Sequence, residues 1–204
     1  MKTSRFIYFT IFTFLLTVGA RAQHRLMMNV NYSVNVPTGS FADFIENTSF
    51  RGWNASVTYR LNQKVAVGAT TGFQDFYRKI DRQVYKDVEG RDISAVITHS
   101  IQTIPFLATV HYGLSPEKRL QPYLALGAGA ALVMRSRYLG QFADNHSKVK
   151  LAARLEVGLF IPIKKESEGG INIATAFNFI PYNEDELKNL NSLAITLGAK
   201  FPLR

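Results

Sequence analysis

The chain has 204 residues, of which 47% are hydrophobic and 19% charged, with a formal net charge of +9 and no cysteine. This composition is too apolar for a disordered chain and too polar for a bundle of membrane-spanning helices. The lack of cysteine excludes disulfide scaffolds, thiolate zinc sites and cysteine nucleophiles, and four histidines leave little room for a metal site. The positive charge is modest for this length, so we expect no nucleic-acid partner.

The first segment has the three regions of an export signal. Basic residues precede an apolar h-region over residues 6–18, and Ala20 and Ala22 supply the small side chains that signal peptidase requires. The apolar stretch is shorter than the ~18 residues that mark a membrane-spanning helix. We therefore interpret residues 1–22 as a cleaved signal peptide and residues 23–204 as one mature domain.

Apolar and polar residues alternate with a period of two along the mature chain. Residues 28–36 read Met-Asn-Val-Asn-Tyr-Ser-Val-Asn-Val, a pattern that a strand separates onto two faces and a helix would mix. The same alternation predicts strands over residues 28–36, 53–61, 65–74, 103–112, 149–162, 171–179 and 192–201. An eighth strand is expected over residues 123–134, although this segment could also be a buried helix. Its alternate glycines, Gly127 and Gly129, would each destabilise a helix by about 1 kcal/mol.

The strand lengths and connections are typical of an outer-membrane barrel. A strand of about ten residues, tilted by ~45°, crosses about 23 Å, close to the ~25 Å apolar band of such barrels. Turns over residues 62–63, 113–121 and 164–170 alternate with longer loops over residues 37–50, 77–98, 135–148 and 180–191. The sequence therefore predicts an all-β, eight-stranded antiparallel up-and-down transmembrane β-barrel in the Gram-negative outer membrane. Both termini would lie with the turns, in the periplasm.

The two faces of each strand distinguish a membrane barrel from a soluble one. Opposite the apolar faces, the strands carry small or polar residues, and the bulky ionisable ones are Arg60, His111, Lys150, Arg154, Glu156 and Lys200. Side chains can fill an eight-stranded lumen, and the apolar faces carry more bulk than that lumen holds. We expect the apolar faces to meet lipid, and a lipocalin-like periplasmic carrier is the alternative.

Three segments resemble a known group of proteins. They are residues 104–107 (Ile-Pro-Phe-Leu), residues 121–129 (Gln-Pro-Tyr-Leu-Ala-Leu-Gly-Ala-Gly) and residues 193–201 (Leu-Ala-Ile-Thr-Leu-Gly-Ala-Lys-Phe). The mature chain resembles the small eight-stranded outer-membrane barrels of the OmpX/OmpA type. It is most similar to the outer-membrane β-barrel domain family typical of Bacteroidota. The resemblance implies a fold and a location rather than an activity.

The inner faces of the predicted strands carry a polar cluster. Its members are Lys150, Arg154, Glu156, Asn172 and Asn178. Arg154 and Glu156 are two residues apart on one strand, so both point inward at nearby heights. Because an unpaired charge in a confined lumen is costly, we expect Glu156 to bond to Arg154, Lys150 or another inward cation. The lumen would then be plugged.

The longest non-periodic stretch, residues 77–98, is a candidate interaction loop. It carries four acidic residues and five basic ones. The basic residues are Arg78, Lys79, Arg82, Lys86 and Arg91. Long loops on rigid scaffolds often carry function, so we expect this one to meet lipopolysaccharide phosphates or a protein. A hydrated surface loop without a partner is the alternative.

The sequence offers only weak evidence for a catalytic arrangement of side chains. His99 and Ser100 are neighbours whose side chains would point in opposite directions on an extended segment. Asp144-Asn145-His146 puts an acid and an imidazole on one face, and Asp87-Val88-Glu89 adds an acidic pair, which faintly resembles omptin-type protease barrels. There is no phosphate loop or spaced set of metal ligands. We therefore expect no catalytic, cofactor-binding or metal-binding residues, no cofactor and no enzyme activity.

These observations predict a non-enzymatic integral outer-membrane barrel with a plugged lumen. Its role would be structural, or interaction at the surface through long extracellular loops. Its expected partners are outer-membrane lipid and lipopolysaccharide. An accessory subunit of an envelope secretion or barrel-assembly complex is the alternative, and a loop-borne hydrolase is a further one.

Overall fold

The structure is a computed structural model that describes residues 26–86, 92–116, 119–139, 142–164, 168–184 and 187–203. Within these ranges, only the backbone is described for residues 83–86, 92–95, 139, 142–144 and 184. The expected signal peptide, residues 1–22, lies outside the described residues.

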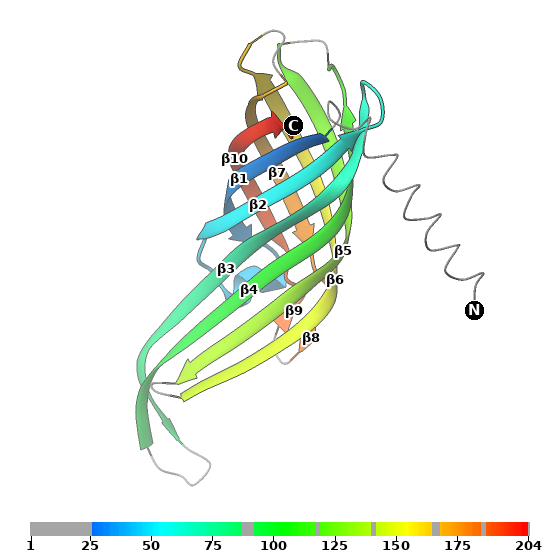
Figure 1. Ribbon diagram of the computed structural model, residues 1–204. Coiled ribbons are helices and arrows are strands. Elements are labelled where there is room, and N and C mark those ends of the chain that lie inside the picture. The colour runs from blue at the N-terminus through cyan, green and yellow to red at the C-terminus, as the bar shows by residue number, and fades with distance from the viewer. Residues whose placement is uncertain are drawn as a thin grey trace, which may run out of the picture.

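Eight long strands close into a barrel (Figure 1). They are β1 (Leu26–Pro37), β2 (Ser49–Arg60), β3 (Val65–Lys86), β4 (Asp92–Gly113), β5 (Gln121–Leu139), β6 (Phe142–Pro162), β7 (Gly170–Phe179) and β10 (Ser192–Pro202). Each strand pairs antiparallel with its neighbours in the order β1-β10-β7-β6-β5-β4-β3-β2. Pairing of β1 with β10, for example Met28 opposite Phe201, closes the ring. The predicted all-β, eight-stranded antiparallel up-and-down barrel is confirmed.

The barrel has its apolar side chains outside and its polar side chains inside. In β7, each exposed residue alternates with a buried one, and the buried set includes Asn172 and Asn178. Outside, Leu126 is 62% exposed and Leu151 is 74% exposed. A lipocalin-like carrier would turn this apolar face inward, so the soluble alternative does not fit the structure.

The prediction of long loops is wrong for two of the four segments, because strands continue through most of each. Residues 77–98 form the far parts of β3 and β4, and residues 135–148 form those of β5 and β6. The pairing runs out to Lys86 opposite Asp92. Where both faces of a sheet meet water, no apolar face is required, so the period-two signal disappears while the backbone pairing continues.

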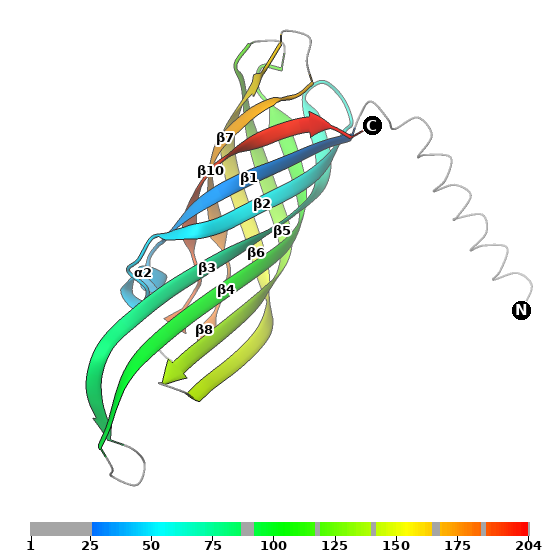
Figure 2. The same cartoon turned by 60° about the vertical axis from the view of Figure 1, so that its left-hand side comes forward.

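The extended parts of β3–β6 form a sheet that stands beyond the rest of the barrel (Figure 2). We call it the protruding sheet and define it as residues 75–86, 92–102, 134–139 and 142–152. On one side, the pairing of β2 with β3 stops at Gly52 opposite Gln74. On the other side, the pairing of β6 with β7 stops at Ala153 opposite Phe179. The protruding sheet therefore has an edge strand at each side.

The other two long connections fold over the loop end of the lumen. They contain the helix α2 (Ser40–Phe44) and a small hairpin of β8 (Asn183–Glu184) and β9 (Leu187–Lys188). Gly39 turns the chain from β1 into α2 with a φ of 61°, in the left-handed region that favours glycine. Figure 2 shows α2 at the base of the protruding sheet.

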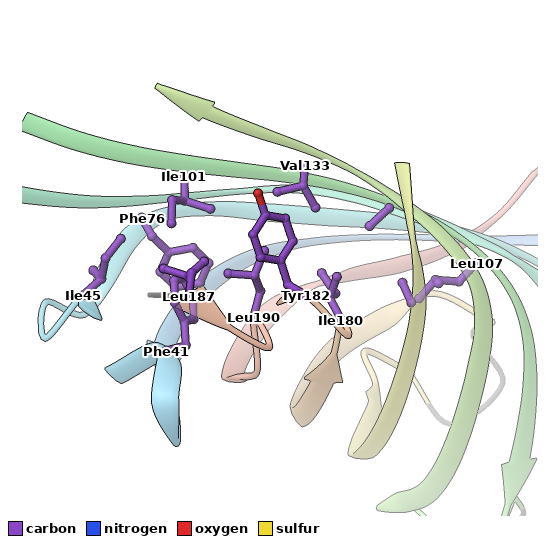
Figure 3. Packing of buried hydrophobic residues seen from close by; sticks show 12 residues of the cluster. Phe41, Ile45, Phe76, Ile101, Leu107, Val133, Ile180, Tyr182, Leu187 and Leu190 are labelled. Carbon is purple, nitrogen blue, oxygen red and sulfur yellow. The ribbon is translucent and has the colours of Figure 1, made fainter. Parts of the chain in front are cut away.

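A buried apolar cluster, which we call the cap cluster, joins these connections to the barrel wall (Figure 3). Its members are Phe41, Ile45, Phe76, Ile101, Leu107, Ala131, Val133, Ala152, Ile180, Tyr182, Leu187 and Leu190. The rings of Phe41 from α2 and Phe76 from β3 meet edge to face, with centroids 4.8 Å apart. The main apolar core therefore lies at the loop end of the barrel, not at its middle.

Candidate functional site

The middle of the lumen holds a buried ion pair on β6. Arg154 donates to Glu156 Oε2 from Nη2 at 2.7 Å and from Nε at 2.9 Å, and it donates to Asn178 Oδ1 from Nη1 at 3.0 Å. Arg154 is 7% exposed and Glu156 is 8% exposed. On β5, the residue opposite Arg154 is Gly127, which adds no side chain to the lumen. Every charge of this pair thus faces a partner.

A tyrosine completes the shell of Glu156. The hydroxyl of Tyr123 donates to Glu156 Oε1 at 2.7 Å, so both carboxylate oxygens accept hydrogen bonds. Tyr123 is absent from the predicted cluster. The signal that could have identified it is its position on β5, where it shares the inner face with Ala125 and Gly127.

Amide side chains extend this network across the lumen. Asn178 Nδ2 donates to Ser192 Oγ at 3.2 Å, and Ser192 Oγ donates to Gln74 Oε1 at 3.4 Å. Nearer the turns, Asn172 Nδ2 donates to Asn31 Oδ1 at 3.4 Å, and Asn31 Nδ2 donates to Asn54 Oδ1 at 2.7 Å. Polar side chains from five strands therefore meet inside the barrel.

One member of the predicted cluster lies apart from this network. The ammonium of Lys150 is 5.0 Å from the ring centroid of Tyr182, at the cap cluster. The structure brings Arg154, Glu156 and Asn178 into direct contact, and it places Asn172 in the neighbouring amide layer. Lys150 sits two rows nearer the loop end than Arg154, on the same inner face of β6.

Little space remains beside the ion pair. A cavity of about 10 Å³ is lined by Asn29, Asn54, His111 and Glu156 among others, which is room for about one water molecule. Asn29 Oδ1, Asn54 Nδ2 and His111 Nε2 are buried and find no hydrogen-bond partner among the described residues. These atoms surround a position where one water could bridge them.

The residues of the predicted interaction loop are distributed over a hairpin. Arg78 turns toward the cap, where its Nη1 donates to the carbonyl of Phe44 at 2.5 Å. Lys79 and Arg82 are exposed on β3, whose register shifts between Ile80 and Gln83. Lys86 belongs to β3, but its side chain is not described, and Arg91 lies outside the described residues.

Cationic side chains help to hold α2 in place. The guanidinium of Arg135 lies 5.7 Å from the ring centroid of Phe44, and the His99 ring meets the same ring edge to face at 5.1 Å. Together with the Arg78 bond, these contacts attach the last residue of α2 to β3, β4 and β5. Sequence reasoning missed this cap. The available signal was apolar residues at inner positions near the strand ends, such as Phe76 and Ile101.

Among the predicted hydrolase candidates that the structure describes, His99 and Ser100 do not converge. His99 is buried on the inner face of β4, whereas Ser100 donates to Asp75 Oδ1 at 3.1 Å. The side chain of Asp144 is not described, and residues 87–89 lie outside the described residues. In the described part of the chain, no three His, Cys, Asp or Glu side chains are grouped to hold a metal ion. No described helix is long and apolar enough to cross a membrane.

Comparison with known proteins supports the fold. No protein-family model and no curated protein matches the chain. The chain is similar to the crystal structure of Neisserial surface protein A, with 13% identity, a TM-score of 0.56, and coverage of 88% of this chain and 97% of that one. For the outer-membrane protein OprG of Pseudomonas aeruginosa, the identity is 11%, the TM-score 0.49, and the coverage 88% and 96%.

A third similar structure is Ail, the attachment invasion locus protein of Yersinia pestis, in complex with the heparin analogue sucrose octasulfate. Its identity is 17%, its TM-score 0.45, and the coverage is 87% of this chain and 97% of that one. At these identities the comparisons concern the fold alone, and they do not bear on a Bacteroidota origin. The chain forms a closed antiparallel barrel, and 88% of it aligns with Neisserial surface protein A. It therefore has the fold of the small eight-stranded outer-membrane β-barrels.

Proposed function

We propose that the protein is a non-enzymatic integral outer-membrane barrel with a closed lumen, whose protruding sheet interacts with another molecule at the cell surface. The exposed apolar band supports insertion, because burying this surface in lipid removes it from water. In this proposal residues 1–22 are removed on export. The turns and both termini then face the periplasm, and the protruding sheet faces outward.

The observation that carries the proposal is the pair of edges on the protruding sheet. No described strand pairs with residues 142–152 of β6 on the side where β7 has ended. On β3, Ser49 Oγ, at the start of β2, donates to the carbonyl of Asp75, and Asn47 Nδ2, in the preceding connection, donates to that of Tyr77. The strand β3 continues beyond both. Exposed edge strands present backbone donors and acceptors that pair readily with another chain.

Charge favours a partner or surface that carries anionic groups. Lys79 and Arg82 are exposed on the outer part of β3, with the exposed Asp81 between them. Arg137 of β5 and Lys148 of β6 are exposed as well. Cationic side chains at this height would lie close to lipopolysaccharide phosphates, or to acidic groups on a protein partner. We propose lipid and lipopolysaccharide as the immediate surroundings of the sheet, with a protein strand as the partner of its edges.

The test shortens the β3–β4 hairpin and measures whether a surface partner still co-purifies. Wild type and a variant with residues 80–97 replaced by a two-residue turn are cross-linked on intact cells and purified in mild detergent. We expect the same surface partner on every wild-type preparation and none on the shortened variant. Heat-modifiable migration on an unboiled gel shows that the shortened barrel still folds.

Two outcomes would contradict the proposal. A partner that is retained by the shortened variant would not depend on the outer β3 edge or on Arg82, both of which that variant lacks. A stoichiometric complex of periplasmic or assembly proteins, present with both chains, would favour an accessory subunit of an envelope machine.

A further inference from the structure

A second cavity opens at the turn end of the barrel, remote from the protruding sheet. Its volume is about 340 Å³, within the range of small-molecule sites, whereas the space at the buried ion pair is about 10 Å³. Residues from separate parts of the chain line it, including Arg60 of β2, Phe160 of β6, Glu168 of the β6–β7 turn and Lys200 of β10. The last strand thus completes a chamber made by the turns.

Positive charge dominates the described lining of this chamber. Arg60, Lys64 and Lys200 face one carboxylate, that of Glu168. Arg60 Nη1 lies 3.4 Å from Glu168 Oε1, a long contact between two partly exposed side chains. The ammonium of Lys200 lies 5.2 Å from the ring centroid of Phe160. Cations gathered around a shared space repel each other, and an anion between them removes that repulsion.

The inner end of the chamber offers a further polar group. His111 lines both this cavity and the small one at the ion pair, and its buried Nε2 has no hydrogen-bond partner among the described residues. The centroid of the adjacent Tyr123 ring lies 5.9 Å from that of His111, and the Tyr123 hydroxyl donates its hydrogen bond to Glu156. The chamber therefore ends at the lumen network, where the His111 ring separates it from the small cavity at the ion pair.

We propose that this chamber binds a small anion bearing a carboxylate or phosphate group between Arg60 and Lys200, with His111 at its inner end. A guanidinium binds both kinds of group through two parallel hydrogen bonds, and an ammonium adds a flexible point charge. Glu168 is the internal competitor, because its carboxylate occupies Arg60 when the ligand is absent. The site is independent of the protruding sheet.

The experiment follows backbone amides by NMR in the full mature chain, folded in uncharged detergent micelles. Inorganic phosphate and acetate are titrated separately at constant ionic strength. We expect saturable shifts at the β2–β3 and β6–β7 turns. Arg60→Gln and Lys200→Gln should each weaken binding about tenfold or more, because each removes a charge-assisted contact. Glu168→Gln should strengthen binding by removing the competing carboxylate.

The matched control is Lys164→Gln, since Lys164 is exposed at the same end but does not line the chamber. It removes one charge, as Lys200→Gln does, and should leave the affinity unchanged. Equal weakening by both lysine variants would show a diffuse positive field and overturn the site. So would a lack of saturation with both anions in wild type, or unchanged affinity in Glu168→Gln, a variant that keeps every cation. The relative response to phosphate and acetate decides which group the site prefers.

Discussion

Arg154 and Glu156 show how two charges are accommodated inside an eight-stranded barrel. They occupy alternate positions of one strand, and their side chains meet at 2.7 Å because small residues on the neighbouring strands leave room. Tyr123 and Asn178 supply the remaining hydrogen bonds. A buried pair satisfied in this way contributes little net stability over apolar residues, but removing one partner leaves the other charge uncompensated.

The first prediction separates these two effects. Glu156→Ala should lower the free energy of unfolding by about 3–5 kcal/mol, because Arg154 then stays buried without its partner. The double change Arg154→Met with Glu156→Leu should lower it less. Both are measured by urea unfolding in lipid vesicles. A double variant that is less stable than Glu156→Ala would mean that the network as a whole, not the pairing of charges, stabilises the lumen.

Among the elements, α2 and the β8–β9 hairpin differ most from simple surface loops. Their apolar side chains enter the barrel mouth and pack against inner residues of β3, β4 and β5, as Phe41, Leu187 and Leu190 do (Figure 3). The bond from Ile45 N to the carbonyl of Phe41, 2.8 Å long, lies within the α2 connection, and that from Leu190 N to the carbonyl of Ile180, also 2.8 Å, closes the β8–β9 connection. The cap therefore depends on tertiary packing.

The second prediction concerns this cap. Phe41 is fully buried, so Phe41→Ala should cost about 3–5 kcal/mol of local packing. We expect faster hydrogen exchange at the amides of Ile45 and Leu190, with exchange in β7 and β10 unchanged. Phe50→Ala is the matched control, because Phe50 is 65% exposed. Equal acceleration in both variants would show that the cap does not depend on the Phe41 contact.

At the scale of the whole molecule, the chain is arranged inversely to a soluble protein. The outer surface is apolar and the interior is a layer of asparagine, serine, threonine and paired charges, with the apolar core restricted to the cap. Lipid accounts for this inversion, since exterior side chains then lie in hydrocarbon and interior ones bond to each other.

The third prediction tests which face meets lipid. Leu155 points outward on β6 beside Arg154, so Leu155→Arg should destabilise the inserted barrel by about 2–4 kcal/mol. Ile163→Arg is the control. Ile163 is also exposed but lies past the end of β6, where a charge near the interface costs about 0–1 kcal/mol. Folding into vesicles is read by heat-modifiable migration. Equal effects of the two changes would contradict the lipid-facing assignment.

The fourth prediction concerns conductance. Wild type in a planar bilayer should show rare, small openings at most, because side chains fill the mid-barrel and the cap covers its loop end. Glu156→Ala should open more often, and Phe41→Ala should open no more than wild type, since the mid-barrel network is intact. A large, stable conductance from wild type would refute the closed lumen.

The sequence by itself determined the eight barrel strands, though not the full length of β3–β6, together with their antiparallel order and the assignment of their two faces. Lipid on one side and a narrow lumen on the other demand strict alternation, which is visible in a run such as residues 28–36. It also placed Arg154, Glu156 and Asn178 on one inner surface, because the period of two is geometric.

Only the tertiary structure decided the rest. Beyond the cap, the protruding sheet is exposed on both faces, as consecutive residues 145–149 of β6 are, so its outer strands need no strict alternation and resemble a loop in the sequence. The cap joins residues as distant as Phe41 and Leu187, and the turn-end chamber joins Arg60, Glu168 and Lys200. Such contacts arise from ring closure and from packing between distant segments, which no local period encodes.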